Sequence, residues 1–95
     1  MTTYLSASEN DLMATEFTLN GKDGRMYLQS HHPYDNTEYH WAVRDPQDGS
    51  WKVYRAGRYQ ITLGSAMTQL DPETVAHKLL ALDRAAGLKP RTAIW

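Results

Sequence analysis

The chain contains no cysteine, so neither a disulfide framework nor a thiolate zinc site can form. No apolar run approaches the roughly 20 residues that a membrane-spanning helix needs. The opening residues, MTTYLSASENDL, lack the basic start and the apolar stretch of a secretory signal. These absences predict a soluble protein of the cytoplasm.

The composition predicts one small folded domain. The 95 residues are 41% hydrophobic and 11% aromatic, which is enough apolar material for a core but too little chain for two domains. No internal repeat or low-complexity segment divides the chain. We therefore expect a single domain over residues 1–95.

The charge is unevenly distributed although the formal net charge is only -1. Residues 1–50 hold three basic and eight acidic groups, whereas residues 51–95 hold seven basic and three acidic groups. No acid occurs from Gly49 to Leu70, where three cations lie among aromatic residues. This stretch is either an ordinary solvated strand face or a surface that meets an anion.

Alternation of apolar and polar residues predicts five strands between residues 15 and 63, at 15–19, 25–30, 37–44, 50–55 and 58–63. The connecting stretches NGKDG and DPQDG are rich in residues that favour turns. Residues 1–12 and the tail 88–95 show no clear period. We expect both ends to be irregular.

The third predicted strand has two distinct faces. One would carry Tyr39, Trp41 and Val43, and the other Glu38, His40 and Arg44. If the DPQDG turn pairs Arg44 with Ser50, the first face meets Trp51 and Val53 of the next strand. Trp41 and Trp51 are then the predicted inward anchors of the core.

The turn at Ala56 and Gly57 is harder to align. A plain two-residue loop would mix the faces, so we expect a bulge or a three-residue loop at Gly57 that brings Val53 opposite Ile61. The last strand would then direct three apolar side chains inward, namely Tyr59, Ile61 and Leu63.

The segment 71–87 carries the signals of a helix, with Asp71 as N-cap, Pro72 at the first position and Gly87 after the end. Its predicted buried stripe consists of Val75, Leu79, Leu82 and Ala86. The predicted fold class is thus α+β, an antiparallel meander of about five strands with one C-terminal helix packed on one face.

Candidate chemistry concentrates in SHHPYDNTEYHW, residues 30–41. Glu38 and His40 share a strand face and Asp35 is near in sequence, but His31 and His32 point to opposite sides of an extended chain. A metal site here competes with a simpler interpretation, a polar loop that leads into a strand. The chain also lacks a Walker A loop, a GxGxxG motif and a serine elbow. We expect no cofactor, no metal and no enzymatic activity.

A binding surface is the remaining expectation, and its candidate residues on and around the outer sheet face are Tyr27, His40, Arg44, Lys52, Tyr54, Arg55 and Arg58. In its small size, lack of cysteine and polarised charge, the chain resembles phage and mobile-element accessory proteins, including anti-CRISPR inhibitors. The resemblance implies a protein-binding inhibitor or adaptor, with a protein as the expected partner.

Nucleic-acid binding is the alternative. The order of strands YHWAVRD, WKVYRAG and RYQITLG followed by a helix is similar in layout to the DNA-binding domains of the AP2 and integrase arm-binding type, over residues 38–86. That likeness implies a sheet that reads DNA through Arg44, Lys52, Tyr54 and Arg58. The acidic balance of the first half opposes it, because carboxylates repel phosphate.

Overall fold

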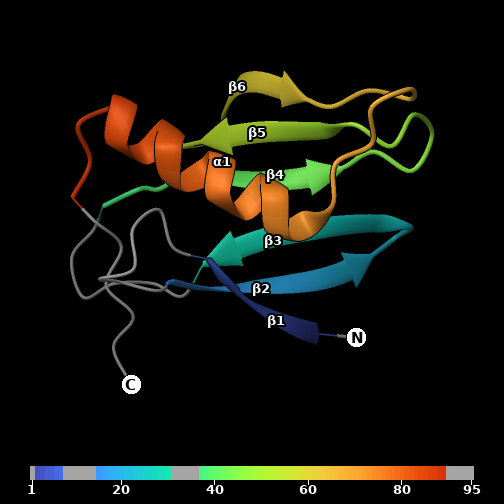
Figure 1. Ribbon diagram of the computed structural model, residues 1–95, viewed down its shortest axis with the longest axis horizontal. Coiled ribbons are helices and arrows are strands. Elements are labelled where there is room, and N and C mark those ends of the chain that lie inside the picture. Colours follow the sequence, from blue (N-terminus) through green and yellow to red (C-terminus); the bar gives the residue numbers. More distant parts are fainter. Residues whose placement is uncertain (1, 8–14, 31–36, 90–95) are drawn as a thin grey trace.

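The structure, a computed structural model, describes residues 2–7, 15–30 and 37–89. Within these ranges, six antiparallel strands follow one another across a single sheet, and one helix lies across one face of it (Figure 1). The elements are β1 Thr2–Ala7, β2 Thr15–Lys22, β3 Arg25–Ser30, β4 Trp41–Arg44, β5 Trp51–Arg55, β6 Arg58–Leu63 and α1 Pro72–Ala85. The α+β meander with a C-terminal helix is therefore confirmed, with six strands in place of about five.

The additional strand is β1, in the segment that we expected to be irregular. It pairs with β2 so that Leu5 lies opposite Phe17 and Ala7 opposite Thr15. Ala7 is buried and Leu5 packs against the core. Only these two apolar residues alternate with polar ones, which is too short a pattern to predict a strand at the edge of a sheet.

The helix begins and ends where its capping residues predict. The Asp71 side chain accepts a hydrogen bond from the Thr74 backbone N–H at 3.1 Å. At the other end, the N–H groups of Gly87 and Leu88 donate to the carbonyls of Arg84 and Asp83, both at 3.0 Å. These two hydrogen bonds form a Schellman motif, which the positive φ of Gly87 permits. None of the helices in the described ranges is long and apolar enough to cross a membrane.

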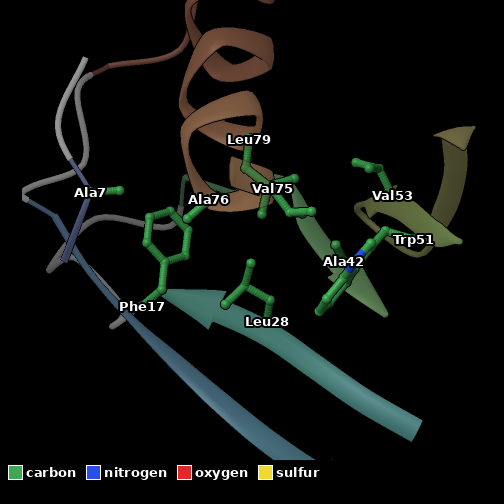
Figure 2. Close-up of a cluster of buried hydrophobic side chains, with 9 residues drawn as sticks. All are labelled: Ala7, Phe17, Leu28, Ala42, Trp51, Val53, Val75, Ala76 and Leu79. Atoms are coloured by element: carbon green, nitrogen blue, oxygen red, sulfur yellow. The ribbon is translucent and has the colours of Figure 1, made fainter. Parts of the chain in front are cut away.

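The core lies between the helix and the sheet face that it covers, which we call the inner face (Figure 2). Trp51 is 1% exposed, and its indole Nε1 donates to the Leu70 carbonyl oxygen at 3.0 Å. Around it pack buried side chains from five strands and the helix, namely Ala7, Phe17, Leu28, Ala42, Val53, Val75, Ala76 and Leu79. The predicted stripe is confirmed at Val75 and Leu79, whereas Leu82 is half-buried and Ala86 is exposed.

The faces of β4 are opposite to our expectation. Arg44 pairs with Trp51, not with Ser50, so the whole strand is shifted by one residue against β5. Because side chains alternate, this shift turns Ala42 toward the helix and Trp41 and Val43 toward the opposite, outer face. Trp41 is therefore not a core anchor beneath the helix, although Trp51 is.

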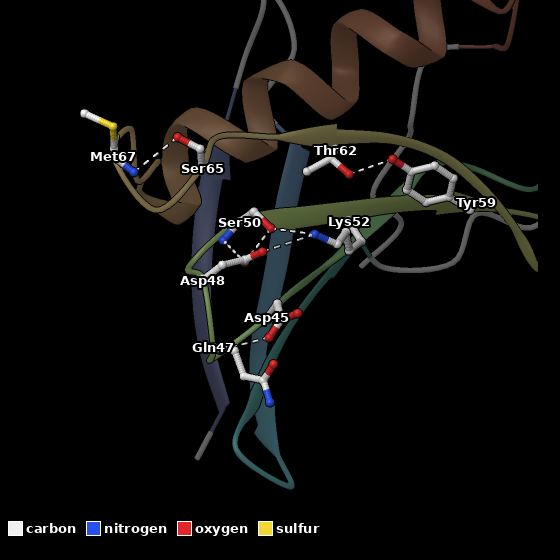
Figure 3. A network of polar contacts seen from close by, with 9 residues as sticks. All are labelled: Asp45, Gln47, Asp48, Ser50, Lys52, Tyr59, Thr62, Ser65 and Met67. Carbon is white, nitrogen blue, oxygen red and sulfur yellow. Dashed lines mark hydrogen bonds and ion pairs between the residues drawn. The ribbon is translucent and has the colours of Figure 1, made fainter.

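Hydrogen bonds within the β4–β5 loop explain the shift (Figure 3). The Asp45 N–H donates to the Ser50 carbonyl and the Gly49 N–H to the Asp45 carbonyl, both at 2.8 Å. The Asp45 carboxylate also accepts from the Gln47 N–H, and that of Asp48 accepts from the Ser50 N–H. Residues 45–50 thus form an ordered loop that lies outside the β4 and β5 strands.

The β5–β6 hairpin confirms Val53 opposite Ile61 but reaches that register differently. Ala56 and Gly57 form a two-residue turn, and the irregularity lies within the strands, between Val53 and Tyr54. As a result Tyr59 pairs with Tyr54 and lies on the outer face, which corrects our prediction that it points inward. Ile61 is 42% exposed at the edge of the sheet.

Candidate functional site

The candidate site is the outer face of the sheet, opposite the helix. Consecutive strands β3 to β6 each place one aromatic residue there, namely Tyr27, Trp41, Tyr54 and Tyr59. Because β4 is shifted, Trp41 lies directly opposite Tyr54, and Tyr54 lies opposite Tyr59. We call these four side chains the aromatic row.

The rings of the aromatic row pack against each other. Those of Trp41 and Tyr54 are stacked with centroids 5.0 Å apart and an angle of 19° between planes. Tyr27 stacks on Trp41 at 6.3 Å and 27°, and Tyr59 meets Tyr54 edge to face at 6.0 Å. Such contacts hold the rings in fixed positions.

Exposure along the aromatic row is graded. Tyr27, Trp41 and Tyr54 are half-buried, whereas Tyr59 is 55% exposed and forms a hydrogen bond with the Thr62 hydroxyl at 2.6 Å (Figure 3). Val43, opposite Tyr27 on the same face, is 7% exposed and is not part of the main core cluster. The outer face therefore carries a second, smaller group of apolar side chains.

Lys52 borders the aromatic row but its charge is partly compensated. Its Nζ donates to the Ser50 hydroxyl at 2.6 Å and lies 3.7 Å from the Asp48 carboxylate (Figure 3). Ser50 in turn donates its hydroxyl to the same carboxylate at 2.6 Å. Hydrogen bonds from the hydroxyl and backbone N–H of Ser50 hold the pKa of Asp48 below its ordinary value of 3.8. The loop therefore stays anionic beside Lys52 at neutral pH.

Arg55 and Arg58 lie opposite each other at the end of the β5–β6 hairpin. The Arg55 Nε donates to the backbone carbonyl of Glu38 at 3.0 Å, which ties the hairpin to the chain before β4. Arg58 is exposed. Of the predicted binding residues, Tyr27, Lys52 and Tyr54 lie on the outer face. Arg55 and Arg58 alternate with Tyr54 and Tyr59, so their side chains leave the hairpin tip on the other face, which corrects the prediction that Arg58 projects from the outer face.

His40 and Arg44 are not on the outer face, which corrects two of our predictions. They have the same parity as Ala42 along the chain, so the one-residue shift of β4 turns them toward the helix side. His40 is 5% exposed. Its ring Nδ1 lies 2.7 Å from the Asp83 carboxylate, and its backbone N–H donates to the same oxygen at 3.1 Å.

The sequence contains one signal for this pair that we did not use. Asp83 follows the buried Leu79 by four positions, which places the two on the same face of the helix. A carboxylate on the buried face of a helix needs a polar partner from the sheet. His40 is that partner, because Asp83 joins the last turns of the helix to the start of β4.

The histidine-rich stretch lies largely outside the described residues, since His31, His32 and Asp35 belong to the segment 31–36. Within the described ranges no group of three His, Asp or Glu side chains is placed to hold a metal ion. The buried side-chain polar atoms of these ranges all have hydrogen-bond partners. The outer face therefore remains the candidate site.

The fold and the site together define a small α+β domain with an aromatic sheet face. Comparison with known proteins finds no family model that matches the chain, and no curated protein or solved structure that is significantly similar to it.

Proposed function

We propose that this protein is a small non-enzymatic protein-binding module, an inhibitor or adaptor, that engages its partner through the outer sheet face. The observation that carries the proposal is the aromatic row, four aromatic side chains aligned across four neighbouring strands on the face opposite the helix. Protein interfaces are enriched in Tyr, Trp and Arg, and their strongest contacts cluster near the centre.

Rigidity of the row supports this proposal. Each ring is packed against a neighbour, so little side-chain entropy remains to be lost on binding. Tyrosine also presents an apolar ring and a hydroxyl, which suits a surface that contacts both apolar and polar groups of a partner. A pre-organised row of this kind favours a protein partner.

Nucleic-acid binding remains a second candidate, favoured by the acid-free stretch from Gly49 to Leu70 with its three cations. Two features weaken it. The ring faces of Trp41 are flanked by Tyr27 and Tyr54, whereas base stacking needs a free ring face. Lys52 is engaged by Asp48, and Arg44 lies on the other side of the sheet.

The proposal is tested by capture and then by affinity. A photo-cross-linking residue at Gln29, exposed on the outer face, should capture a protein partner in cells of the source organism, and the same residue at Lys78 on the exposed helix surface should not. With the captured protein purified, Tyr27→Ala or Tyr54→Ala should weaken binding by about 2 kcal/mol or more. Lys78→Ala is the matched control and should leave the affinity unchanged. Equal affinities for all three variants would refute the proposal.

A further inference from the structure

The tip of the β5–β6 hairpin has an unusual sequence, Tyr-Arg-Ala-Gly-Arg-Tyr over residues 54–59. The register places Tyr54 opposite Tyr59 and Arg55 opposite Arg58. Two cations directly opposite each other on adjacent strands destabilise a hairpin. Within the sequence around the hairpin, from Gly49 to Leu70, no acid occurs.

The turn residue adds a second local cost. Ala56 has φ 54°, in the left-handed region that glycine, asparagine and aspartate adopt more readily than alanine. The β2–β3 hairpin offers a comparison within the same chain, since Lys22 pairs with Arg25 around Asp23 and Gly24. There the left-handed residue is Asp23, with φ 53°, which tolerates this conformation and brings a negative charge. The β5–β6 tip lacks both compensations.

Contacts within the described residues leave one arginine side chain of the tip without a partner. Arg55 donates its Nε to the Glu38 carbonyl, so its guanidinium is held near the sheet. Arg58 is exposed, and its guanidinium makes no hydrogen bond or ion pair within the described residues, whereas its backbone carbonyl accepts from the Gln60 side chain at 3.2 Å. One guanidinium is thus fixed, and the other is open to a ligand beside it.

We infer that this hairpin tip is a carboxylate-binding site, which receives an acidic segment of the partner protein. The inference rests on the proposed function and names the chemistry of its partner. Guanidinium groups match carboxylates in geometry and charge, and a carboxylate bound between two arginines that pair across a hairpin offsets the repulsion between them. Arg55 and Arg58 alternate with Tyr54 and Tyr59, so the carboxylate site lies at the end of the aromatic row but on the other face of the hairpin.

A protein carboxylate fits better than a nucleic-acid phosphate chain. The tip offers two cations at one point, whereas a polynucleotide needs cations along a track. The neighbouring Lys52 is engaged by Asp48, and the first 50 residues carry eight acids against three bases. A short acidic segment needs only the local charge of the tip.

The test uses poly-L-glutamate as the probe and nuclear magnetic resonance as the readout. At low salt it should shift the Nε–H signals of Arg55 and Arg58, and Arg58→Gln should weaken binding about tenfold, the loss expected for a charge-assisted contact. Arg25→Gln at the other hairpin tip is the matched control and should bind like the unmodified protein. Single-stranded DNA of similar charge, added separately, should bind more weakly.

Stability measurements separate a lost contact from a damaged fold. Arg58→Gln removes the repulsion with Arg55, so its denaturation midpoint should be equal or higher while its binding falls. Ala56→Gly removes the backbone strain of an alanine in the left-handed region and keeps both arginines. It should therefore raise the denaturation midpoint and retain binding. A lower midpoint in Arg58→Gln, or unchanged probe binding, overturns the inference.

The outcomes distinguish this inference from the proposed function. If the probe leaves both arginine signals unmoved while Tyr27→Ala still loses the captured partner, the carboxylate site is wrong and the protein-binding face stands. If the probe binds the tip but the aromatic variants keep full partner affinity, the tip site stands and the proposed face is wrong. Tighter binding of the DNA than of poly-L-glutamate overturns the assignment of a carboxylate ligand.

Discussion

Trp51 and Trp41 lie on opposite faces of the sheet and have different environments. Trp51 points into the core, and its indole N–H donates a hydrogen bond to the carbonyl oxygen of Leu70, just before the helix. Trp41 lies half-buried on the outer face between two tyrosine rings. The tryptophan of β5 therefore stabilises the core, whereas the tryptophan of β4 forms part of the outer face.

This difference gives a first prediction. Trp51→Ala should lower the free energy of unfolding by about 3 to 5 kcal/mol, as for other fully buried aromatic residues, and Trp41→Ala should lower it less. Urea denaturation measures both. Quenching by acrylamide, in proteins where Trp95 is replaced by Phe, should reach Trp41 and not Trp51. Equal quenching of the two indoles would contradict the face assignment.

The His40–Asp83 pair is a polar contact between the helix and the chain that enters β4, with both side chains almost completely buried. Asp83→Ala removes the acceptor of two His40 groups and should cost about 1 to 3 kcal/mol, and His40→Ala should cost a similar amount. Removing both should cost less than the sum, because the two residues interact. Urea denaturation of the three variants gives the coupling energy, with His77→Ala on the helix as control. Strictly additive losses would show that the pair is not coupled.

At the scale of elements, local signals predict the helix well and the strand register poorly. Asp71, Pro72 and Gly87 act within a few residues of their own position, so their pattern can be interpreted directly. The β4–β5 register depends instead on how two aspartates and Gly49 arrange the loop, with φ 72° at Gly49. Alternation alone fits two registers, and only the loop decides between them.

The same reasoning explains which site residues could be predicted. Tyr27 and Tyr54 face outward in either register of β4, because both lie on other strands, so their prediction survives. His40 and Arg44 lie on β4 or directly before it and change face with the shift. Trp41 joins the aromatic row for the same reason. Prediction of this site was therefore limited by the β4–β5 loop and by the irregularity of the β5–β6 hairpin, which places Tyr59 on the outer face.

A prediction about pH belongs to the helix. Hydrogen bonds from the Thr74 hydroxyl and backbone N–H lower the pKa of Asp71 below its ordinary value of 3.8. A carboxylate with a lowered pKa in the folded state stabilises the fold at pH values above its unfolded pKa, and this contribution is lost as the pH falls through the folded pKa. Asp71→Asn keeps the acceptor without the charge. The stability difference between the two proteins should therefore be largest near neutral pH and shrink in acid, as thermal denaturation at several pH values can measure. A difference that stays constant over that range would contradict the shift.

At the scale of the whole molecule, charge separates along the chain while the net charge stays at -1. The cations from Gly49 to Leu70 lie on β5 and β6, at one side of the sheet (Figure 1). The molecule therefore has a local positive region without a strong positive field. Such a distribution steers one acidic contact more effectively than it holds a long polyanion.

The last prediction follows from that distribution. If nucleic acid were the partner, neutralised phosphates would release counterions, so affinity would fall steeply with salt and reversal of Lys52, Arg55 and Arg58 to glutamate would abolish binding to all sequences alike. We expect instead that gel-shift titrations with duplex DNA, single-stranded DNA and RNA give weak complexes at low salt and none at physiological salt, where charges are screened beyond about 8 Å.

For the protein partner, reversing one of these three charges should mainly slow association, while removal of Tyr54 should speed dissociation. Stopped-flow kinetics resolves the two rates. Nucleic-acid binding would be the better proposal if a nucleic-acid complex persisted at physiological salt and was lost when all three charges were reversed. An aromatic face that recognises a protein is not expected to bind phosphate under those conditions.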